Sequence, residues 1–228
     1  MENARLAAPQ VRLRSILERP RAPLVVVNSP NNPTGTPFPD GAVARLLAET
    51  GALIVMDEAY QDFGGPTAVP LLNDHPRLVV LRTFSKAMSL AGLRFGYALA
   101  HPAVAAEIGK ARLPYNVNRV TLAAAHAALD AADLLAERTR AVRRSRELLE
   151  RRLSGIPGLR AFPSAANFVL IRCVARPAAE VFHRLVEEYG ILVRDVSAGP
   201  GLDGCLRITA GTDEDVEAVA EALSALLA

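Results

Sequence analysis

One lysine in this chain stands among residues that could do chemistry. Lys86 lies in the segment RTFSK (82–86) at the end of an apolar run, and GLR (92–94) follows shortly downstream. Two of the 26 lysines and arginines are lysines, so the chain uses arginine almost everywhere that a cation stands. Unlike arginine, a lysine amine can lose its proton and form a Schiff base with a carbonyl. Lys86 is therefore a candidate for covalent chemistry, and a chance surface lysine is the alternative.

Three short apolar runs, rich in Val, Ile and Leu, precede the residues that could join Lys86. The runs are residues 24–27, 52–56 and 78–81. Because a helix-like stretch at 42–49 lies between the first two, the pattern predicts buried parallel strands with crossover helices. The polar motifs that follow the runs are NSPNNPTG (28–35), DEAY (57–60) and TFSK (83–86). Ligands of open α/β sheets bind beyond the carboxyl ends of the strands, so we expect an amide, a carboxylate, a phenol and an amine to converge there.

These motifs, in this order, resemble the pyridoxal-phosphate-dependent aminotransferases of fold type I, and most closely the histidinol-phosphate aminotransferase-like branch. The segments that carry the resemblance are NPTG (32–35), DEAY (57–60), SK (85–86) with GLR (92–94), NFVL (167–170), GILVRD (190–195) and CLRIT (205–209). Any one of them is explained as well by a turn, a helix cap or a charge at a strand edge. The ordered set, which runs from about residue 24 to the C-terminus, is far more specific.

The resemblance implies roles at the cofactor's ring. Lys86 would hold pyridoxal 5′-phosphate covalently and move a proton at the substrate α-carbon. Asp57 would pair with the pyridine nitrogen, which keeps the ring able to accept electrons. Asn32 and Tyr60 would hydrogen-bond the phenolic oxygen of the cofactor. Lys86, Asp57 and Tyr60 are the residues to which we assign the catalysis.

The resemblance also implies two anion sites. Thr83, Ser85 and Arg94 would hold the cofactor phosphate, with the guanidinium as a planar fork. Arg207 would bind the substrate's α-carboxylate or the phosphate of a phosphorylated amino alcohol, and Arg194 would reinforce that site.

Other polar residues are weaker candidates or have no assigned role. Tyr115 and Asn167 occupy family segments from which they could approach the substrate. The two cysteines, Cys173 and Cys205, fall on expected buried strands, where they are interpreted as reduced core residues. The four histidines are scattered without the spacing of metal ligands, so the sequence predicts no metal site. These histidines are His75, His101, His126 and His183.

The chain divides, by its sequence, into three parts of an α/β protein. Residues 1–130 would form a partial large domain with a mostly parallel sheet and helices, and residues 131–154 an exposed connecting helix. Residues 155–228 would form a small α+β domain with strands near 168–172, 191–193 and 206–209 and helices at 178–189 and 212–227. The acidic residues at 213–214 suit the positive end of the last helix.

The composition is that of an ordinary globular enzyme. The chain has 228 residues, of which 50% are hydrophobic and 22% charged, and a net charge of +2. This balance gives no sign of a nucleic-acid or membrane partner, and no sustained apolar stretch indicates a signal peptide. A cytoplasmic location is therefore expected.

The resemblance implies that an N-terminal part of such enzymes is missing. Family members are longer, and their N-terminal part supplies a glycine turn for the phosphate and an aromatic ring that stacks on the cofactor. The first glycine here is Gly35 and the first aromatic residue is Phe38, and residues 1–10 show no family motif. We therefore expect an uncovered sheet edge, and a partner that is either a second copy or a complementing N-terminal fragment.

The expected function is amino-group transfer between an amino acid or histidinol phosphate and a 2-oxo acid, as part of amino-acid biosynthesis. Two alternatives stay open. One is a catalytically silent remnant of an aminotransferase. The other is a related pyridoxal-phosphate-dependent decarboxylase of phosphorylated amino acids.

Overall fold

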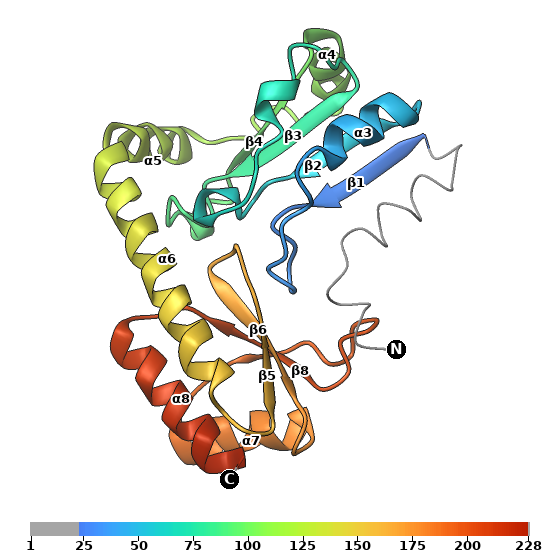
Figure 1. The fold of residues 1–228 in the computed structure, drawn as a ribbon. Coiled ribbons are helices and arrows are strands. Elements are labelled where there is room, and N and C mark those ends of the chain that lie inside the picture. The colour runs from blue at the N-terminus through green and yellow to red at the C-terminus, as the bar shows by residue number, and fades with distance from the viewer. Residues whose placement is uncertain (1–22, 228) are drawn as a thin grey trace. The chain divides into compact units, whose positions relative to one another are not determined.

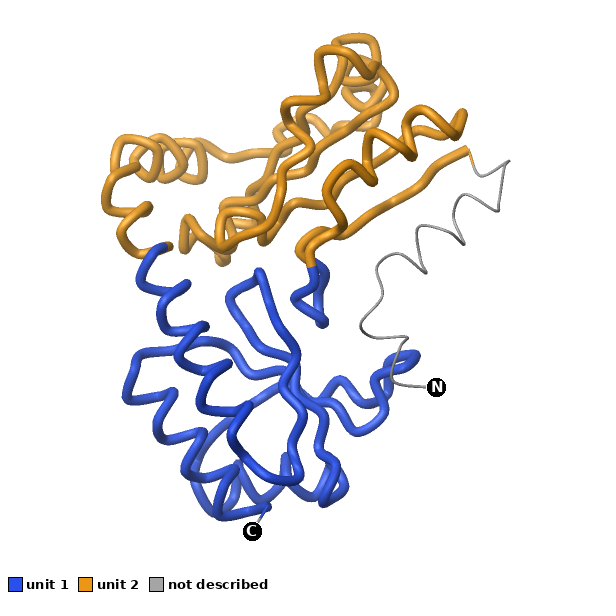
Figure 2. The backbone as a smooth tube through the Cα atoms, in the orientation of Figure 1, with its two compact units in different colours: residues 1–7, 31–36, 140–228 blue, residues 8–30, 37–139 orange. Residues whose placement is uncertain are grey.

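The computed structural model describes residues 23–227 (Figure 1), and the expectation about residues 1–10 lies outside this range. The described residues divide into two compact units (Figure 2). Residues 23–30 and 37–139 make the N-terminal unit, and residues 31–36 and 140–227 make the C-terminal unit. The predicted three-part division at 130 and 154 stays a prediction. Within the described part no helix is long and apolar enough to cross a membrane.

The N-terminal unit is built on a four-stranded sheet of order β1-β2-β3-β4. The strands are β1 (Leu24–Asn28), β2 (Leu53–Asp57), β3 (Leu78–Thr83) and β4 (Gly96–Ala100). The first three are parallel, which confirms the strands predicted from the apolar runs, whereas β4 runs antiparallel to β3. Strand β4 was not predicted, because its sequence GYALA carries little strand signal. A Cβ at Gly96 would lie 2.7 Å from the carbonyl oxygen of Arg82, so this close pairing requires glycine.

One face of this sheet carries the core of the N-terminal unit. Helix α3 (Ala42–Glu49) buries Ala42, Leu46 and Leu47 against that face. Alternate residues of the strands meet the helix, because successive side chains of a strand point to opposite faces. They are Val25, Val27, Ile54, Met56, Leu78 and Val80. Two further helices follow β4, namely α4 (Pro102–Lys110) and α5 (Arg119–Asp130).

The opposite face of β1 corrects the expectation of buried strands. Leu24 and Val26 point away from α3 and are 51% and 63% exposed. An apolar run alone cannot distinguish one covered face from two, since both patterns are rich in Val and Leu.

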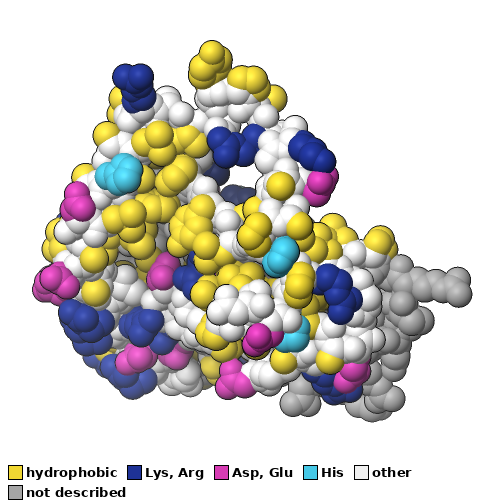
Figure 3. Space-filling view, turned by 90° about the horizontal axis from the view of Figure 1, so that it is seen from above, with side chains coloured by type: hydrophobic (Ala, Val, Ile, Leu, Met, Phe, Trp, Pro, Cys, Tyr) yellow, Lys and Arg dark blue, Asp and Glu magenta, His cyan; other side chains and the backbone are white. Residues whose placement is uncertain are grey.

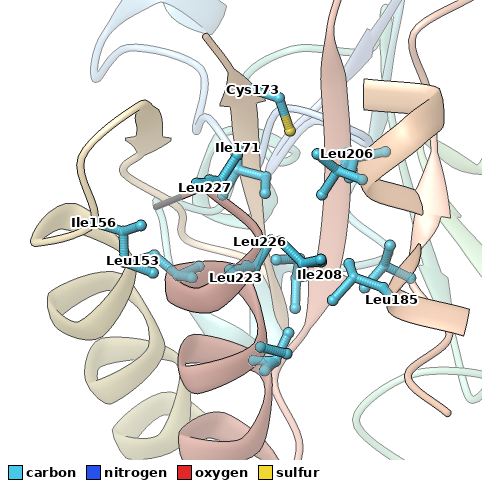
Figure 4. Close-up of a cluster of buried hydrophobic side chains, with 14 of the residues drawn as sticks. Leu153, Ile156, Ile171, Cys173, Leu185, Leu206, Ile208, Leu223, Leu226 and Leu227 are labelled. Atoms are coloured by element: carbon cyan, nitrogen blue, oxygen red, sulfur yellow. The ribbon is translucent and has the colours of Figure 1, made fainter. Parts of the chain in front are cut away.

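The C-terminal unit has an antiparallel sheet of order β5-β6-β8-β7. Its strands are β5 (Leu159–Phe162), β6 (Phe168–Cys173), β7 (Arg194–Asp195) and β8 (Cys205–Thr209). Its helices are α7 (Ala178–Tyr189), α8 (Asp213–Leu227) and most of α6 (Ala132–Ser154), which enters this unit at residue 140. Figure 4 shows apolar side chains from these helices and from β6 and β8 directed toward one another. Leu149 and Leu153 of α6 are fully buried in this core, so the predicted connecting helix is not exposed along its length.

A strand expected at residues 191–193 is the clearest local error. The strand begins instead at Arg194 and has two residues. Gly190 adopts a left-handed conformation that ends α7, and the amide of Ile191 still donates to the carbonyl of Leu185 at 2.9 Å. Val193 then packs into the core, so pairing with β8 starts one residue later.

Candidate functional site

A polar residue ends each of the three parallel strands of the N-terminal unit. Asn28, Asp57 and Thr83 are the last residues of β1, β2 and β3. The register pairs Asn28 with Asp57, so the expected gathering of polar groups at the carboxyl edge is present in this unit. A strand end suits such groups because the chain leaves the apolar core there.

The carboxylate of Asp57 is held in one orientation by two donors. The side-chain amide of Asn28 donates to Oδ2 at 3.0 Å, and the backbone amide of Ala59 donates to Oδ1 at 3.1 Å. Asn28 was not among the predicted site residues. The position of Asn28 at the end of the first apolar run could have indicated a site residue. Only the strand register shows that Asn28 meets Asp57.

Tyr60 and Lys86 meet in the turns that follow β2 and β3. Each lies three positions after the last residue of its strand, Asp57 or Thr83. The Nζ atom of Lys86 stands 5.0 Å from the centre of the Tyr60 ring, at a distance typical of a cation–π contact. Tyr60 is 6% exposed, whereas Lys86 is exposed. The site therefore offers an accessible amine beside a fixed ring.

The residues predicted to hold a phosphate lie at the end of β3 and on its connection to β4. The hydroxyl of Thr83 accepts from the amide of Ser85 at 3.0 Å and donates to the carbonyl of Phe95 at 3.3 Å. Arg94, at φ 52°, is exposed, and its Nη1 donates to the carbonyl of Ala91 at 3.0 Å. The contacts thus join Thr83 and Ser85, while the Arg94 side chain binds its own turn.

A second cluster surrounds Arg207 in the C-terminal unit. Its Nη1 donates to Oδ1 of Asn32 at 2.7 Å, and its guanidinium lies 5.0 Å from the centre of the Phe168 ring. The Nε of Arg207 is buried and has no hydrogen-bond partner among the described residues. A buried donor without a partner is costly, so this atom marks a place where an acceptor would be favourable.

The segment that carries Asn32 is fixed to the C-terminal unit. The amide of Ala165 donates to the carbonyl of Gly35 at 2.8 Å. Gly35 has φ +71°, and a Cβ there would collide with the side chain of Ser164. Glycine is required at this position for both reasons.

Arg194 stands directly opposite Arg207 in the pairing of β7 with β8. Two like charges on facing positions of an antiparallel pair destabilise it unless an anion lies near them. The predicted pair of arginines is therefore brought together, on one face of the small sheet.

Two predicted residues are not drawn into either cluster. Tyr115 lies between α4 and α5 with its side chain fully exposed. Asn167 is half-buried just before β6, and its carbonyl accepts from the amide of Ala210 at 2.9 Å. Their roles stay predictions.

Comparisons with known proteins agree with the motifs. The family described as Aminotransferase class I and II matches residues 10–223. The histidinol-phosphate aminotransferase 2 of Nitrosococcus oceani is 40% identical over 209 residues, which are 91% of this chain and 58% of that protein. The chain thus spans a little more than half the length of this curated relative.

Solved structures show the same fold. The histidinol-phosphate aminotransferase of Sinorhizobium meliloti, solved in complex with pyridoxal-5′-phosphate, is 34% identical with a TM-score of 0.80, over 93% of this chain and 59% of that one. The L-threonine-O-3-phosphate decarboxylase of Porphyromonas gingivalis is 28% identical with a TM-score of 0.81, over 89% of this chain and 63% of that one. These matches confirm the predicted fold class and the predicted family.

Proposed function

Because the chain belongs to the aminotransferase class I and II family, we propose that it binds pyridoxal 5′-phosphate and transfers an amino group between an amino acid or histidinol phosphate and a 2-oxo acid. The observation that carries this proposal is the exposed amine of Lys86, 5.0 Å from the ring of Tyr60, in the unit where both oxygens of Asp57 are held by donors. A role in amino-acid biosynthesis and a cytoplasmic location accompany this proposal.

The residues present fit the cofactor's ring. Pyridoxal phosphate, when bound, supplies an electron sink that lets the α-proton of an amino acid leave. Lys86 has the accessible amine that covalent attachment needs, and the same amine can carry the proton at the substrate α-carbon. Asp57, whose orientation is fixed, presents a carboxylate for the pyridine nitrogen. Tyr60 presents a phenol for the phenolic oxygen, and the amide of Asn32 is proposed to bind the same oxygen.

The phosphate and the substrate would be held by different cations. Thr83, Ser85 and Arg94 offer hydroxyls and a guanidinium for the cofactor phosphate, once Arg94 exchanges the Ala91 carbonyl for the anion. Arg207 offers a buried Nε without a partner in the described part of the chain, and Arg194 faces it across the strand pair. This second site suits the carboxylate of an amino acid or the phosphate of histidinol phosphate.

Peptide mapping tests the proposal directly, because the chain has only two lysines to compare. The chain is incubated with pyridoxal phosphate, reduced with borohydride and digested. We expect the pyridoxyl group on Lys86 and none on Lys110, which pairs with Glu107 at 2.6 Å on the surface of α4. Modification of Lys110 alone, or of neither lysine at saturating cofactor, would show that the assignment is wrong.

Decarboxylation is the second candidate reaction. The structural match to L-threonine-O-3-phosphate decarboxylase favours it, since that protein shares the fold and acts on a phosphorylated amino acid. Product analysis separates the two reactions, because a 2-oxo acid product indicates transfer and carbon dioxide indicates decarboxylation. A chain that retains no cofactor on purification and takes up none would be the silent remnant.

We also propose that the chain works with a further polypeptide, either a second copy or a complementing N-terminal fragment. Apolar side chains on β1, α4 and α5 are exposed, and Figure 3 shows hydrophobic side chains gathered on the face seen there. The exposed apolar residues of β1, α4 and α5 include Leu24, Val26, Ile108, Val120 and Leu122. Large exposed apolar patches mark interaction sites or aggregation sites, so they support a partner.

A further inference from the structure

A buried carboxylate that the proposed mechanism does not use lies beside Asp57. Glu58 has a side chain with no exposure to solvent, and its carboxylate meets donors from Arg82, Thr67 and Ala68. Its Oε2 pairs with Nη2 of Arg82 at 2.8 Å and accepts from the hydroxyl of Thr67 at 2.8 Å. Its Oε1 accepts from the backbone amide of Ala68 at 2.6 Å. Such a complete set of donors is what a buried charge requires.

Arg82 extends this arrangement to the other side of Tyr60. Its Nη1 reaches Oδ1 of Asp62 at 3.4 Å, and its Nη2 donates to the hydroxyl of Thr67 at 3.0 Å. Glu58 and Asp62 lie two positions before and two positions after Tyr60. One guanidinium therefore binds both flanks of the turn that carries the ring. We call Glu58, Asp62, Thr67 and Arg82 the Arg82 network.

The same arginine is also connected to Lys86. Arg82 lies on β3, and the chain continues through Thr83 into the turn that bears the amine. The side chain of Arg82 thus links the turn after β2 to the strand that leads to Lys86. A lysine could not do this, because a single ammonium lacks the fork that spans two carboxylates.

We propose that Arg82 is a positioning residue, which through Glu58 and Asp62 holds the Tyr60 ring against the amine of Lys86. This inference rests on the proposed function for the roles of Tyr60 and Lys86, while the contact itself is a property of the chain alone. Stability is a weak reason for such a pair, since burying two charges costs about as much as their attraction returns. The Arg82 network does restrict geometry, which is what a reacting amine needs, because the Glu58 carboxylate and both terminal nitrogens of the guanidinium have partners; the Nε atom of Arg82 is buried without a partner among the described residues.

Nuclear magnetic resonance of the two lysines tests the inference without any cofactor. Reductive methylation with ¹³C-formaldehyde labels Lys86, Lys110 and the α-amine, and a Lys110→Arg variant assigns the signals. An aromatic ring displaces the resonance of a group held over its face, so we expect the Lys86 methyl signal to be displaced from that of Lys110. Tyr60→Leu should abolish the displacement. All samples are measured at the same pH.

The decisive variant is the double substitution Glu58→Gln with Arg82→Gln. It removes both members of the buried pair, whereas Arg82→Gln alone would leave Glu58 as an uncompensated buried charge. Asp62→Asn, which keeps the buried pair and weakens one flank, is the milder variant and decides the matter if the double variant does not fold. Arg77→Gln is the matched control, because Arg77 also binds two acceptors in this unit, the carbonyls of Leu47 and Thr50.

We expect the Lys86 signal to lose most of its displacement in the double variant, to lose part of it in Asp62→Asn and to be unchanged in Arg77→Gln. The proposal would be overturned if the Lys86 signal kept its wild-type position in the folded double variant or in the folded Asp62→Asn variant. It would also be overturned if Tyr60→Leu left the signal at its wild-type position. Cofactor uptake is measured separately by absorbance. A chain that takes up no cofactor but shows the expected displacements would refute the proposed function and leave the positioning role intact.

Discussion

Single residues with proposed roles are held by partners that are distant in the sequence. Asn28 is 29 positions from Asp57, and Asn32 is 175 positions from Arg207. In each pair an amide fixes the direction of a charged group. Fixed direction matters because misplacing a reacting group by about 1 Å can cost on the order of a hundredfold in rate.

Asn28→Ala should weaken binding of pyridoxal phosphate by about tenfold or more. Asp57 would lose one of its two donors, and a hydrogen bond to a charged group contributes about 1.5–3 kcal/mol. Absorbance titration of the chain with the cofactor measures this affinity. Asn73→Ala is the control, since Asn73 is an exposed asparagine of the same unit and is not a candidate site residue. Equal affinities of the Asn28 variant and the wild type would contradict the role of Asp57.

Arg207→Lys should impair use of substrate more than loading of cofactor, and Arg94→Lys should do the reverse. A point ammonium cannot replace the planar fork at either anion site. Cofactor titration and the KM of the amino donor, measured on both variants, separate the two effects. If both variants lost cofactor and substrate affinity alike, the assignment of two separate anion sites would be wrong.

At the scale of elements, strands and the short connections between them, rather than helices, carry the candidate residues. The turns after β1, β2 and β3 hold Asn32, Tyr60 and Lys86, and the rigid strands determine where these turns begin. Helices α3, α7 and α8 instead complete the two cores. This separation is common in enzymes, since loops can vary in chemistry while the strands keep their geometry.

Gly35→Ala should destabilise the C-terminal unit by more than Gly41→Ala destabilises the N-terminal unit. Both glycines have positive φ, +71° and +73°, so each substitution carries backbone strain of about 1–2 kcal/mol. Only at Gly35 would the new Cβ also collide, with Ser164, because nothing lies within 4 Å at Gly41. Urea denaturation of both variants measures the difference. Equal losses of unfolding free energy in the two variants would mean that the 31–36 segment shifts to avoid the collision with Ser164 at no energetic cost.

At the scale of the whole molecule, each unit has its own core, and the core of the C-terminal unit makes its stability depend on pH. The core of the C-terminal unit includes a titratable group, Cys173 of β6. Burial, with smaller effects of Cys205 and Asp195, raises the pKa of the Cys173 thiol from 9.0 to about 11. Burial also raises the pKa of Cys205. The thiols therefore keep their protons to a higher pH in the folded unit than in the unfolded chain.

The free energy of unfolding of the C-terminal unit should fall between about pH 9 and pH 11. In this window the unfolded chain releases a proton that folded Cys173 keeps, so the slope is negative and reaches about 1.4 kcal/mol per pH unit. Urea denaturation at several pH values measures the slope. Cys173→Ala should make the slope shallower, and Cys205 should contribute part of the slope that remains. The same slope in variant and wild type would show that Cys173 does not contribute.

The exposed face of β1 should take part in self-association. Val26→Glu places a charge among exposed apolar side chains and should shift the chain toward monomer in sedimentation velocity experiments. Val174→Glu is the control, since Val174 is similarly exposed, 70% against 63%, but belongs to the C-terminal unit. If Val26→Glu left the association unchanged in a chain that does self-associate, another surface would be responsible.

The sequence by itself determined the family, the three parallel strands, most of the helices and the motifs with their order. It did so because strand runs, turn residues and short motifs are local signals. Only the tertiary structure decided which partner each polar group meets: Asn28 at Asp57, Asn32 at Arg207, and Arg82 at both Glu58 and Asp62. It also decided that β1 has one covered face and that β4 joins the sheet in the opposite direction. These features depend on register and on what packs against a strand, which are set by residues far away in the chain and leave no periodic trace in the strand's own sequence.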